Sequence, residues 1–137
     1  MTFMSADAGR KGSRKRRRAL RLCRVLTSGG AVACERCEIA DRPLARMRGL
    51  LGRDSLETGG GMLLTPEPSV HMAFMRFAID VVFVDRDHKV VGVRHELRPW
   101  RAAGARGAYA TLELPAGAAA AAGIEEGDVL VLEDLET

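Results

Sequence analysis

The residues best suited to chemistry lie close together in the stretch SVHMAFMRFAIDVVFVDRD, residues 69–87. His71, Arg76 and Asp80 stand there among methionine, phenylalanine and valine side chains. Apolar surroundings shift the pKa of an ionisable group, so an aspartate in such a setting can act as a general base or as a polar anchor in a pocket. The same aspartate can instead have a purely structural role, and the sequence leaves both alternatives open.

A structural role for Asp80 follows from the strand predicted over residues 79–84. Alternation places Ile79, Val81 and Phe83 on one face and Asp80 on the other, and both faces are otherwise apolar. The strand is therefore expected to be central and covered on both sides. A buried carboxylate needs either a guanidinium or several backbone N–H donors, since unpaired burial costs several kcal/mol. The candidate guanidinium groups are those of Arg46, Arg53 and Arg76, which would let Asp80 tie the helix or the preceding turn to the sheet.

Other catalytic and metal-binding patterns are missing from the sequence. His71, His88 and His95 do not have recognisable metal-ligand spacing, so no metal and no cofactor is expected. His71 is expected to be exposed or hydrogen-bonded, or else to line the mouth of a pocket. The chain contains no G-x-S-x-G motif, and its TGGGM stretch lacks the Lys-Ser/Thr of a P-loop.

Trp100 is the only tryptophan and lies in the arginine-rich stretch LRPWRAAGARG. It can stack against a ligand ring or a base. The alternative is that its ring covers an open end of the core.

The cysteine pattern CERC has the C-x-x-C spacing of redox and zinc sites. Its flanks alternate like a strand, in which Cys34 and Cys37 would point to opposite faces. A second pair of zinc ligands is also missing. Together with Cys23 these are expected to be free thiols, and without an export signal they indicate a cytoplasmic, reducing setting.

Charge is distributed unevenly along the chain. The formal net charge is +3, but residues 1–24 hold nine Lys or Arg and one acid, whereas residues 25–137 hold twelve basic and seventeen acidic residues, a net of −5. Residues 1–18 are expected to be a disordered tail, because dense like charges resist compaction. Contact of residues 10–18 with nucleic acid or anionic lipid is one interpretation, and a solubilising segment is the other. The chain has no apolar run long enough to span a membrane.

The remaining sequence predicts one β-rich domain over residues 19–137, expected to be a monomer. A hairpin is expected over residues 20–39, and a helix over about 42–51, with Asp41 as N-cap and an apolar stripe that docks on the core. A second helical turn is expected at about 116–122. With about eight short strands, the fold class is mainly β, an antiparallel sandwich or barrel-like domain. The helix stripe consists of Leu44, Met47 and Leu51, and Gly52 is expected to end it.

Several ordered motifs resemble the family known as domain of unknown function 192. They are RMRGLLGRDSL, GGMLL, VHMAFMRFAIDVVFVDRDHKVVGV, LRPW and YATLELPAG followed by GIEEGD. The resemblance spans about residues 24–134 and implies a compact, largely β domain with no established activity. This chain departs from the common pattern HTFGMRFPIDVVF, because Phe74 and Ala78 stand where the pattern has glycine and proline. The pattern members here are Arg46, Gly49, Leu50, Arg53, Met75, Asp80, Glu113, Gly117, Gly127 and Asp128.

These patterns favour a non-catalytic binding or accessory module for a small ligand or a protein segment. The binding module is favoured because no nucleophile with an adjacent base can be named. The alternative is a small enzyme that uses Asp80 with His71 or Arg53 as an acid–base pair. A nucleic-acid or lipid contact through the basic tail is the third alternative. It is disfavoured and expected to be weak, because the folded part of the chain is acidic and aromatic residues make up only 4% of the sequence. The candidate binding residues are Arg46, Arg53, His71, Met75, Asp80, Trp100 and Glu113.

Overall fold

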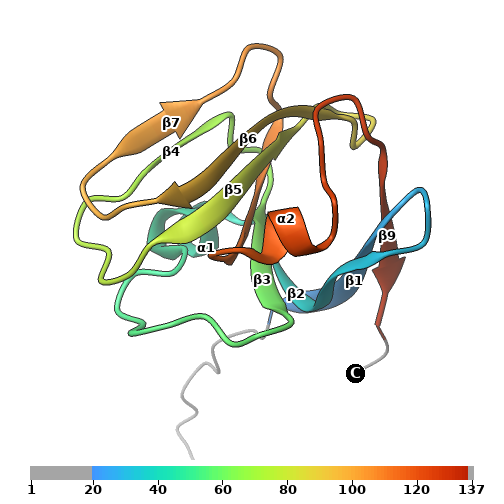
Figure 1. The fold of residues 1–137 in the computed structure, drawn as a ribbon. Coiled ribbons are helices and arrows are strands. Elements are labelled where there is room, and N and C mark those ends of the chain that lie inside the picture. Colours follow the sequence, from blue (N-terminus) through green and yellow to red (C-terminus); the bar gives the residue numbers. More distant parts are fainter. Residues whose placement is uncertain (1–19, 136–137) are drawn as a thin grey trace, which may run out of the picture.

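Residues 20–135 of the chain are described by a computed structural model (Figure 1). Seven strands form one curled sheet in the order β6-β5-β8-β3-β2-β1-β9, and β4 pairs with β7 in a separate two-stranded sheet. The mainly β, barrel-like class predicted from the sequence is confirmed. The strands are β1 (Arg21–Thr27), β2 (Val32–Ala40), β3 (Gly60–Leu64), β4 (Ser69–His71), β5 (Ile79–Val84), β6 (Val90–Leu97), β7 (Ala102–Gly104), β8 (Ala110–Pro115) and β9 (Leu130–Asp134).

The sheet is antiparallel except at one pair, because β2 and β3 run parallel. The antiparallel arrangement expected from the sequence therefore holds for every pair of the large sheet except this one. A parallel pair needs a crossover connection, and the chain provides it as residues 41–59, which include the first helix. The predicted hairpin over residues 20–39 is confirmed by the antiparallel pairing of β1 with β2.

The two ends of the curled sheet approach each other through the segment before β9. Lys89 forms an isolated antiparallel bridge with Val129. The N–H of Leu130 donates to the carbonyl of His88 at 2.9 Å, and the N–H of Val90 donates to the carbonyl of Asp128 at 2.7 Å. These bonds bring the β5–β6 turn beside β9 and give the sheet its barrel-like form.

Each face of the sheet covers a separate hydrophobic cluster. The inner cluster, on the concave side, joins residues from β1, β2, β5, β8 and β9 with the second helix. The outer cluster, on the opposite face, includes Met62, Met72, Met75 and Val81, and Leu50 from the crossover packs into it. All six residues of β5 are buried, so this strand is covered on both faces as predicted.

The first helix, α1 (Pro43–Arg48), is shorter than predicted and contributes no buried residue. The expected docking of its apolar stripe was wrong, because Leu44 and Met47 are 78% and 74% exposed. Ala45 packs partly against the outer cluster instead. The N-cap position is occupied by Arg42 without a side-chain cap, rather than by Asp41. The helix ends at Gly49 and not at the predicted Gly52. Gly49 takes a positive φ of 47°, a conformation in which glycine commonly ends helices.

The second helix, α2 (Ala118–Ala121), lies within the predicted range and is attached to the sheet by Asp80. The N–H groups of Gly117 and Ala119 donate to Oδ2 of Asp80 at 3.0 and 2.9 Å. The N–H of Glu96 in β6 donates to Oδ1 at 2.9 Å. Of the two partner types expected for this carboxylate, the described residues provide backbone donors and no guanidinium. Asp80 therefore connects three elements, β5, β6 and α2.

The three cysteines lie together in the inner cluster, which corrects the expectation that Cys34 and Cys37 point apart. Cys23 pairs with Cys37, whereas Val25 pairs with Cys34, so β2 contains one more residue than β1 in this interval. A β-bulge of this kind reverses the side-chain alternation. Hydrogen bonds with Cys23 and Cys34, followed by burial, raise the pKa of the Cys37 thiol. Cys37 is therefore a protonated, inert thiol.

The tail prediction for residues 1–18 falls outside the described residues. Within residues 20–135, no helix combines the length and the apolar character needed to cross a membrane.

We expect Asp80→Asn to lower the free energy of unfolding by about 2 to 4 kcal/mol. An amide NH₂ in place of one carboxylate oxygen would face buried N–H donors and leave at least one of them without an acceptor. Urea unfolding followed by circular dichroism measures the change. The matched control is Asp85→Asn, because Asp85 also accepts two backbone N–H bonds but in an exposed turn. Equal losses in both variants would contradict the role assigned to Asp80.

Candidate functional site

The outer face of the sheet contains a row of side chains with two acids. Glu38 on β2 is paired with Met62 on β3, and Met62 is paired with Glu113 on β8. Glu113 is in turn paired with Val81 on β5. Directly paired residues share a face, and adjacent strands lie about 4.8 Å apart. The two acids are therefore about 10 Å apart at the backbone, on the side of the outer cluster.

Arg53 reaches this row from the crossover that follows α1. Its two terminal nitrogens donate to the carboxylate of Glu38 at 2.9 and 3.1 Å, a bidentate pair. These hydrogen bonds raise the pKa of Arg53, and the charge of Glu113 acts in the same direction. The crossover is thus held against the outer face by a fixed guanidinium, close to Glu113.

Glu113 is 7% exposed, and its carboxyl group has no hydrogen-bond donor among the described residues. Burial raises its pKa to about 7, the charge of Glu67 adds to this, and the charge of Arg53 opposes it. Burial outweighs the nearby cation because Arg53 is already paired with Glu38. Glu113 therefore exchanges a proton near neutral pH, which makes it the most readily titrated buried carboxyl group of this face.

The carboxyl oxygens of Glu113 keep a contact with solvent. Among the described residues, the only fully buried side-chain polar atom without a hydrogen-bond partner is Nε of Arg24. An unpaired Glu113 oxygen must therefore touch solvent. A ligand group that donates a hydrogen bond could reach the carboxyl group from outside.

Two exposed aromatic side chains, Phe74 and Trp100, form the second feature of this side, here called the aromatic pair. Their ring centroids are 4.8 Å apart and their planes meet at 60°. They are 73% and 66% exposed. Because the rings meet edge to face, ring surface stays open to a binding partner. Trp100 lies outside both hydrophobic clusters, so it does not cover an open end of the core.

The backbone holds the aromatic pair in place. The N–H of Trp100 donates to the carbonyl of Met72 at 2.8 Å, and the N–H of Met72 donates to the carbonyl of Arg101 at 2.6 Å. These bonds extend the pairing of β4 with β7. Met72 and Met75, on either side of Phe74, are buried in the outer cluster. Backbone hydrogen bonds and buried methionines therefore hold the loop before β5 and the loop after β6 in place, whereas the two aromatic rings remain exposed.

Both aromatic residues have a left-handed backbone, with φ of 64° at Phe74 and 69° at Trp100. For a bulky residue this conformation is strained, because Cβ approaches the neighbouring backbone. The family pattern that this chain resembles has glycine at the position of Phe74, and glycine adopts this conformation without strain. Phe74 therefore combines a backbone conformation that favours glycine with an exposed ring.

The structure brings some of the candidate residues together and separates others. Arg53, Met75 and Glu113 belong to the outer face. Asp80 lies on the opposite face of β5, fully buried. His71 is exposed on β4. Arg46 is half-buried on α1, where its Nη1 donates to the carbonyl of Asp41 at 3.3 Å.

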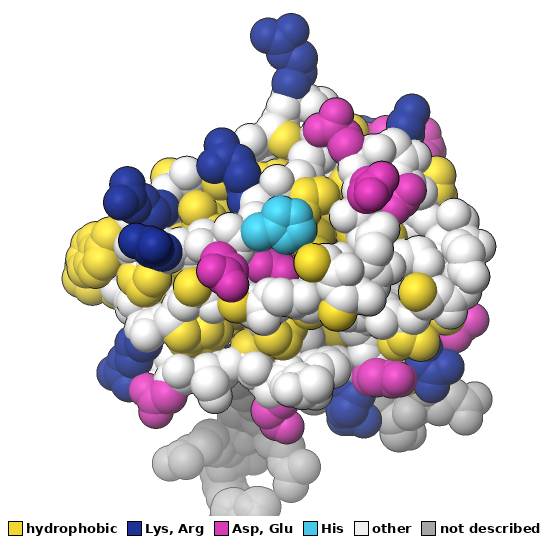
Figure 2. All heavy atoms as spheres, viewed as in Figure 1, with side chains coloured by type: hydrophobic (Ala, Val, Ile, Leu, Met, Phe, Trp, Pro, Cys, Tyr) yellow, Lys and Arg dark blue, Asp and Glu magenta, His cyan; other side chains and the backbone are white. Residues whose placement is uncertain are grey.

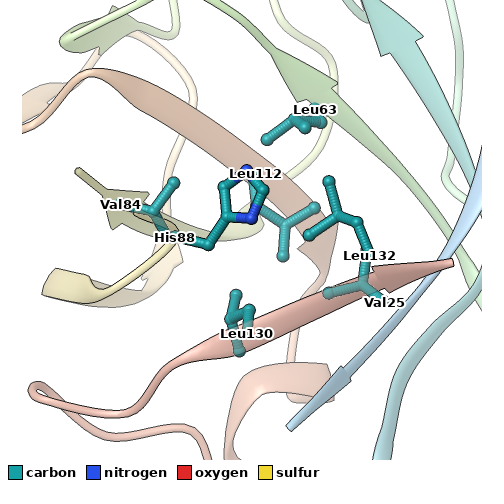
Figure 3. A pocket seen from close by; sticks show the side chains of 7 residues that line it. All are labelled: Val25, Leu63, Val84, His88, Leu112, Leu130 and Leu132. Carbon is teal, nitrogen blue, oxygen red and sulfur yellow. The ribbon is translucent and has the colours of Figure 1, made fainter. Parts of the chain in front are cut away.

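Sequence reasoning missed Glu38 and Phe74. Phe74 had a signal, because it replaces the glycine of the resembled pattern. His88 lies in the turn between β5 and β6. Figure 3 shows its ring pointing into an apolar cavity that is lined by side chains of β1, β3, β5, β8 and β9. The cavity volume of about 10 Å³ is room for about one water molecule, so it does not hold a ligand. In residues 20–135, no three His, Cys, Asp or Glu side chains are placed to hold a metal ion.

Comparison with protein families places these features in a known group. Residues 24–132 match the family model for domain of unknown function 192, described as an uncharacterised ACR. The chain belongs to this family. A UPF0127 protein of Thermococcus sibiricus is 37% identical over 76 residues, which cover 53% of this chain and 49% of that protein. This chain therefore spans about half the length of that relative.

Two crystal structures resemble the fold of this family member. A protein of unknown function from Novosphingobium aromaticivorans is 27% identical, with a TM-score of 0.69 over 80% of this chain and 83% of that one. A putative transcription regulator from Sinorhizobium meliloti is 24% identical, with a TM-score of 0.74 over 87% of this chain and 98% of that one. The second likeness concerns the fold alone.

The raised pKa of Glu113 predicts that stability falls as pH rises. The folded chain binds the Glu113 proton up to a pKa of about 7, against 4.5 as the ordinary value. Between these values Glu113 binds more protons in the folded state than in the unfolded state. The contribution of this group to stability is therefore fully present below pH 4.5 and is lost as pH rises through 7. The loss is on the order of 3 kcal/mol.

Glu113→Gln should remove this loss and be more stable than the unmodified chain at pH 8. Urea unfolding of both proteins from pH 5 to pH 8 measures the difference, in which all other titrating groups cancel. Two parallel pH profiles would show that Glu113 has an ordinary pKa.

Proposed function

We propose that this domain is a non-catalytic binding module whose contact surface is the aromatic pair. The observation that carries this proposal is the exposure of two large rings on strained, hydrogen-bonded backbone. Each such residue costs on the order of 1 to 3 kcal/mol, and strain of this kind gathers at functional sites. Buried contacts that would compensate within the fold are few, since both rings are more than half exposed.

The acid–base alternative has less support from the geometry. Asp80 and Arg53 act on opposite faces of the sheet, and the Asp80 carboxylate is fully buried against three backbone N–H groups. A general base must come within hydrogen-bond reach of its substrate. His71 is exposed on β4, and no contact between it and Asp80 supports a pair. An accessory role through binding is therefore favoured.

The setting proposed for this module is a reducing one such as the cytoplasm. Cys23, Cys34 and Cys37 are free thiols although they lie together in the core. Proteins of oxidising compartments commonly use cysteines as disulfides.

If the aromatic pair is kept for binding, Phe74→Gly should change the free energy of unfolding by less than about 1 kcal/mol. Glycine relieves the backbone strain, and its larger entropy in the unfolded chain offsets the gain. The matched control is the neighbouring Met72→Ala, which empties a site that is 1% exposed and should cost about 2 to 5 kcal/mol. Thermal unfolding of both variants makes the comparison. A loss in Phe74→Gly as large as in the control would mean that the pair is structural.

The fluorescence of Trp100 provides a direct binding test, because it is the only tryptophan of the chain. Three probes represent the partner classes: an oligothymidylate of about 12 nucleotides, a poly-glutamate peptide and a neutral oligosaccharide. We expect at least one of them to change the emission in a saturable manner, and Phe74→Ala to weaken that response. The proposal is wrong if no probe distinguishes the unmodified chain from Phe74→Ala.

A further inference from the structure

Arginines lie close to the aromatic pair in the sequence. Residues 71–78 and 94–101, which include the two loops, contain four arginines and one glutamate, a formal charge of +3. All four arginines are exposed. Figure 2 shows hydrophobic side chains projecting at the left edge of the molecule, where Figure 1 places the loops before β5 and after β6, with Lys or Arg side chains beside them. The arginines are Arg76, Arg94, Arg98 and Arg101.

Three of these arginines have no acidic partner in the described part of the chain. Arg76 donates to Asp54 at 2.6 Å, but Arg94 on β6 forms no ion pair there. Arg98 and Arg101, on either side of the Pro99-Trp100 step, form none either. Their guanidinium groups are available for an anion. The positive charge is therefore next to the exposed rings in the chain.

This local charge differs in sign from the rest of the domain. Residues 25–137 have a net charge of −5, yet the two segments around the aromatic pair have +3. At physiological ionic strength, charges more than about 8 Å away are largely screened. An anionic partner that contacts the aromatic pair therefore meets mainly the arginines.

Exposed rings beside unpaired guanidinium groups fit one class of polymer particularly well. Bases of a single strand stack on aromatic side chains without regard to sequence, while arginines neutralise its phosphates. In a duplex the bases are already stacked on one another and the rings have no face to meet. We propose that the aromatic pair and Arg98 and Arg101 bind single-stranded nucleic acid. This inference rests on the proposed function and names its partner.

The sequence before β1 adds charge of the same sign. Residues 10–18 contain seven Lys or Arg and no acid. This segment would attract any polyanion, so phosphate attraction alone cannot identify the aromatic pair as the binding surface. The test must vary the rings and the loop arginines while the N-terminal segment stays unchanged.

The experiment measures fluorescence anisotropy of a labelled oligothymidylate of about 12 nucleotides with the full chain. We expect Trp100→Ala and Phe74→Ala each to weaken binding about tenfold or more, because each removes a stacking contact. Trp100→Phe, which keeps a ring, should recover most of the affinity. Circular dichroism confirms that each variant keeps its fold.

The arginines are tested in the same assay, with a single arginine reversal on another strand as the control. The double variant Arg98→Glu and Arg101→Glu should weaken binding and reduce the slope of log affinity against log salt by about 1.4, which corresponds to two phosphate contacts on a single strand. Arg36→Glu reverses another exposed arginine, on β2, and should reduce the slope by less than half as much.

Three outcomes would overturn the inference. The first is unchanged affinity in both alanine variants, which would leave only attraction by the N-terminal segment. The second is equal affinity for a duplex of the same length. The third is binding of poly-glutamate or the oligosaccharide at the aromatic pair with none of the oligothymidylate, in which case the proposed binding function stands and its partner is not a nucleic acid.

Discussion

The contacts of Asp80 constrain the rest of this fold. A carboxylate without access to water has to be surrounded by donors, and the chain provides them from three backbone N–H groups in two distant elements. Two of these groups precede or begin α2, where Gly117 takes a φ of 94° that glycine tolerates. The N-terminal end of α2 and the C-terminal end of β6 are therefore both fixed to the centre of the sheet. Once β5 is held in this way, one of its faces packs into the inner cluster and the other packs into the outer cluster.

The two buried acids of the sheet show opposite solutions to the same electrostatic problem. The carboxyl group of Asp80 accepts hydrogen bonds from three backbone N–H groups, which is a structural arrangement. Glu113 has no hydrogen-bond donor within residues 20–135. Burial, followed by the charge of Glu67, raises its pKa to about 7, so it holds a proton until about neutral pH. The donors that Glu113 lacks can come from a partner or from water. The outer face is therefore the side on which this domain has unsatisfied polar capacity as well as exposed rings.

Sequence patterns identified features whose cause lies in consecutive residues. Alternation over residues 79–84 indicated a strand covered on both faces, and a second helical turn was expected within residues 116–122, where α2 lies. The faces of Asp80 and Val81 followed directly from that alternation. The position of Arg53 near Glu113 did not, because it depends on how the crossover between the parallel strands β2 and β3 returns across the sheet.

Other features depended on neighbours that a sequence does not reveal. The bulge in β2 moved Cys34 and Cys37 to one face, and its position is determined by pairing with β1. Gly61 is part of the same packing, because a Cβ there would lie 2.9 Å from Sγ of Cys34 and 2.9 Å from the carbonyl oxygen of Glu113. For α1, helical periodicity was a poor guide to burial: a helix this short rests on the sheet through Ala45 and leaves Leu44 and Met47 outside.

The strained loop at Phe74 connects stability with the proposed binding function. If this loop served only to join β4 to β5, glycine at residue 74 would give the same backbone at a lower energy. The adjacent Met72 and Met75 already secure the loop through the outer cluster. A phenylalanine therefore contributes little to the fold beyond its contact with Trp100, which is itself strained and exposed. Two neighbouring departures from the favoured backbone, each bearing a ring, are more economically explained by a partner that covers both rings than by two separate structural needs.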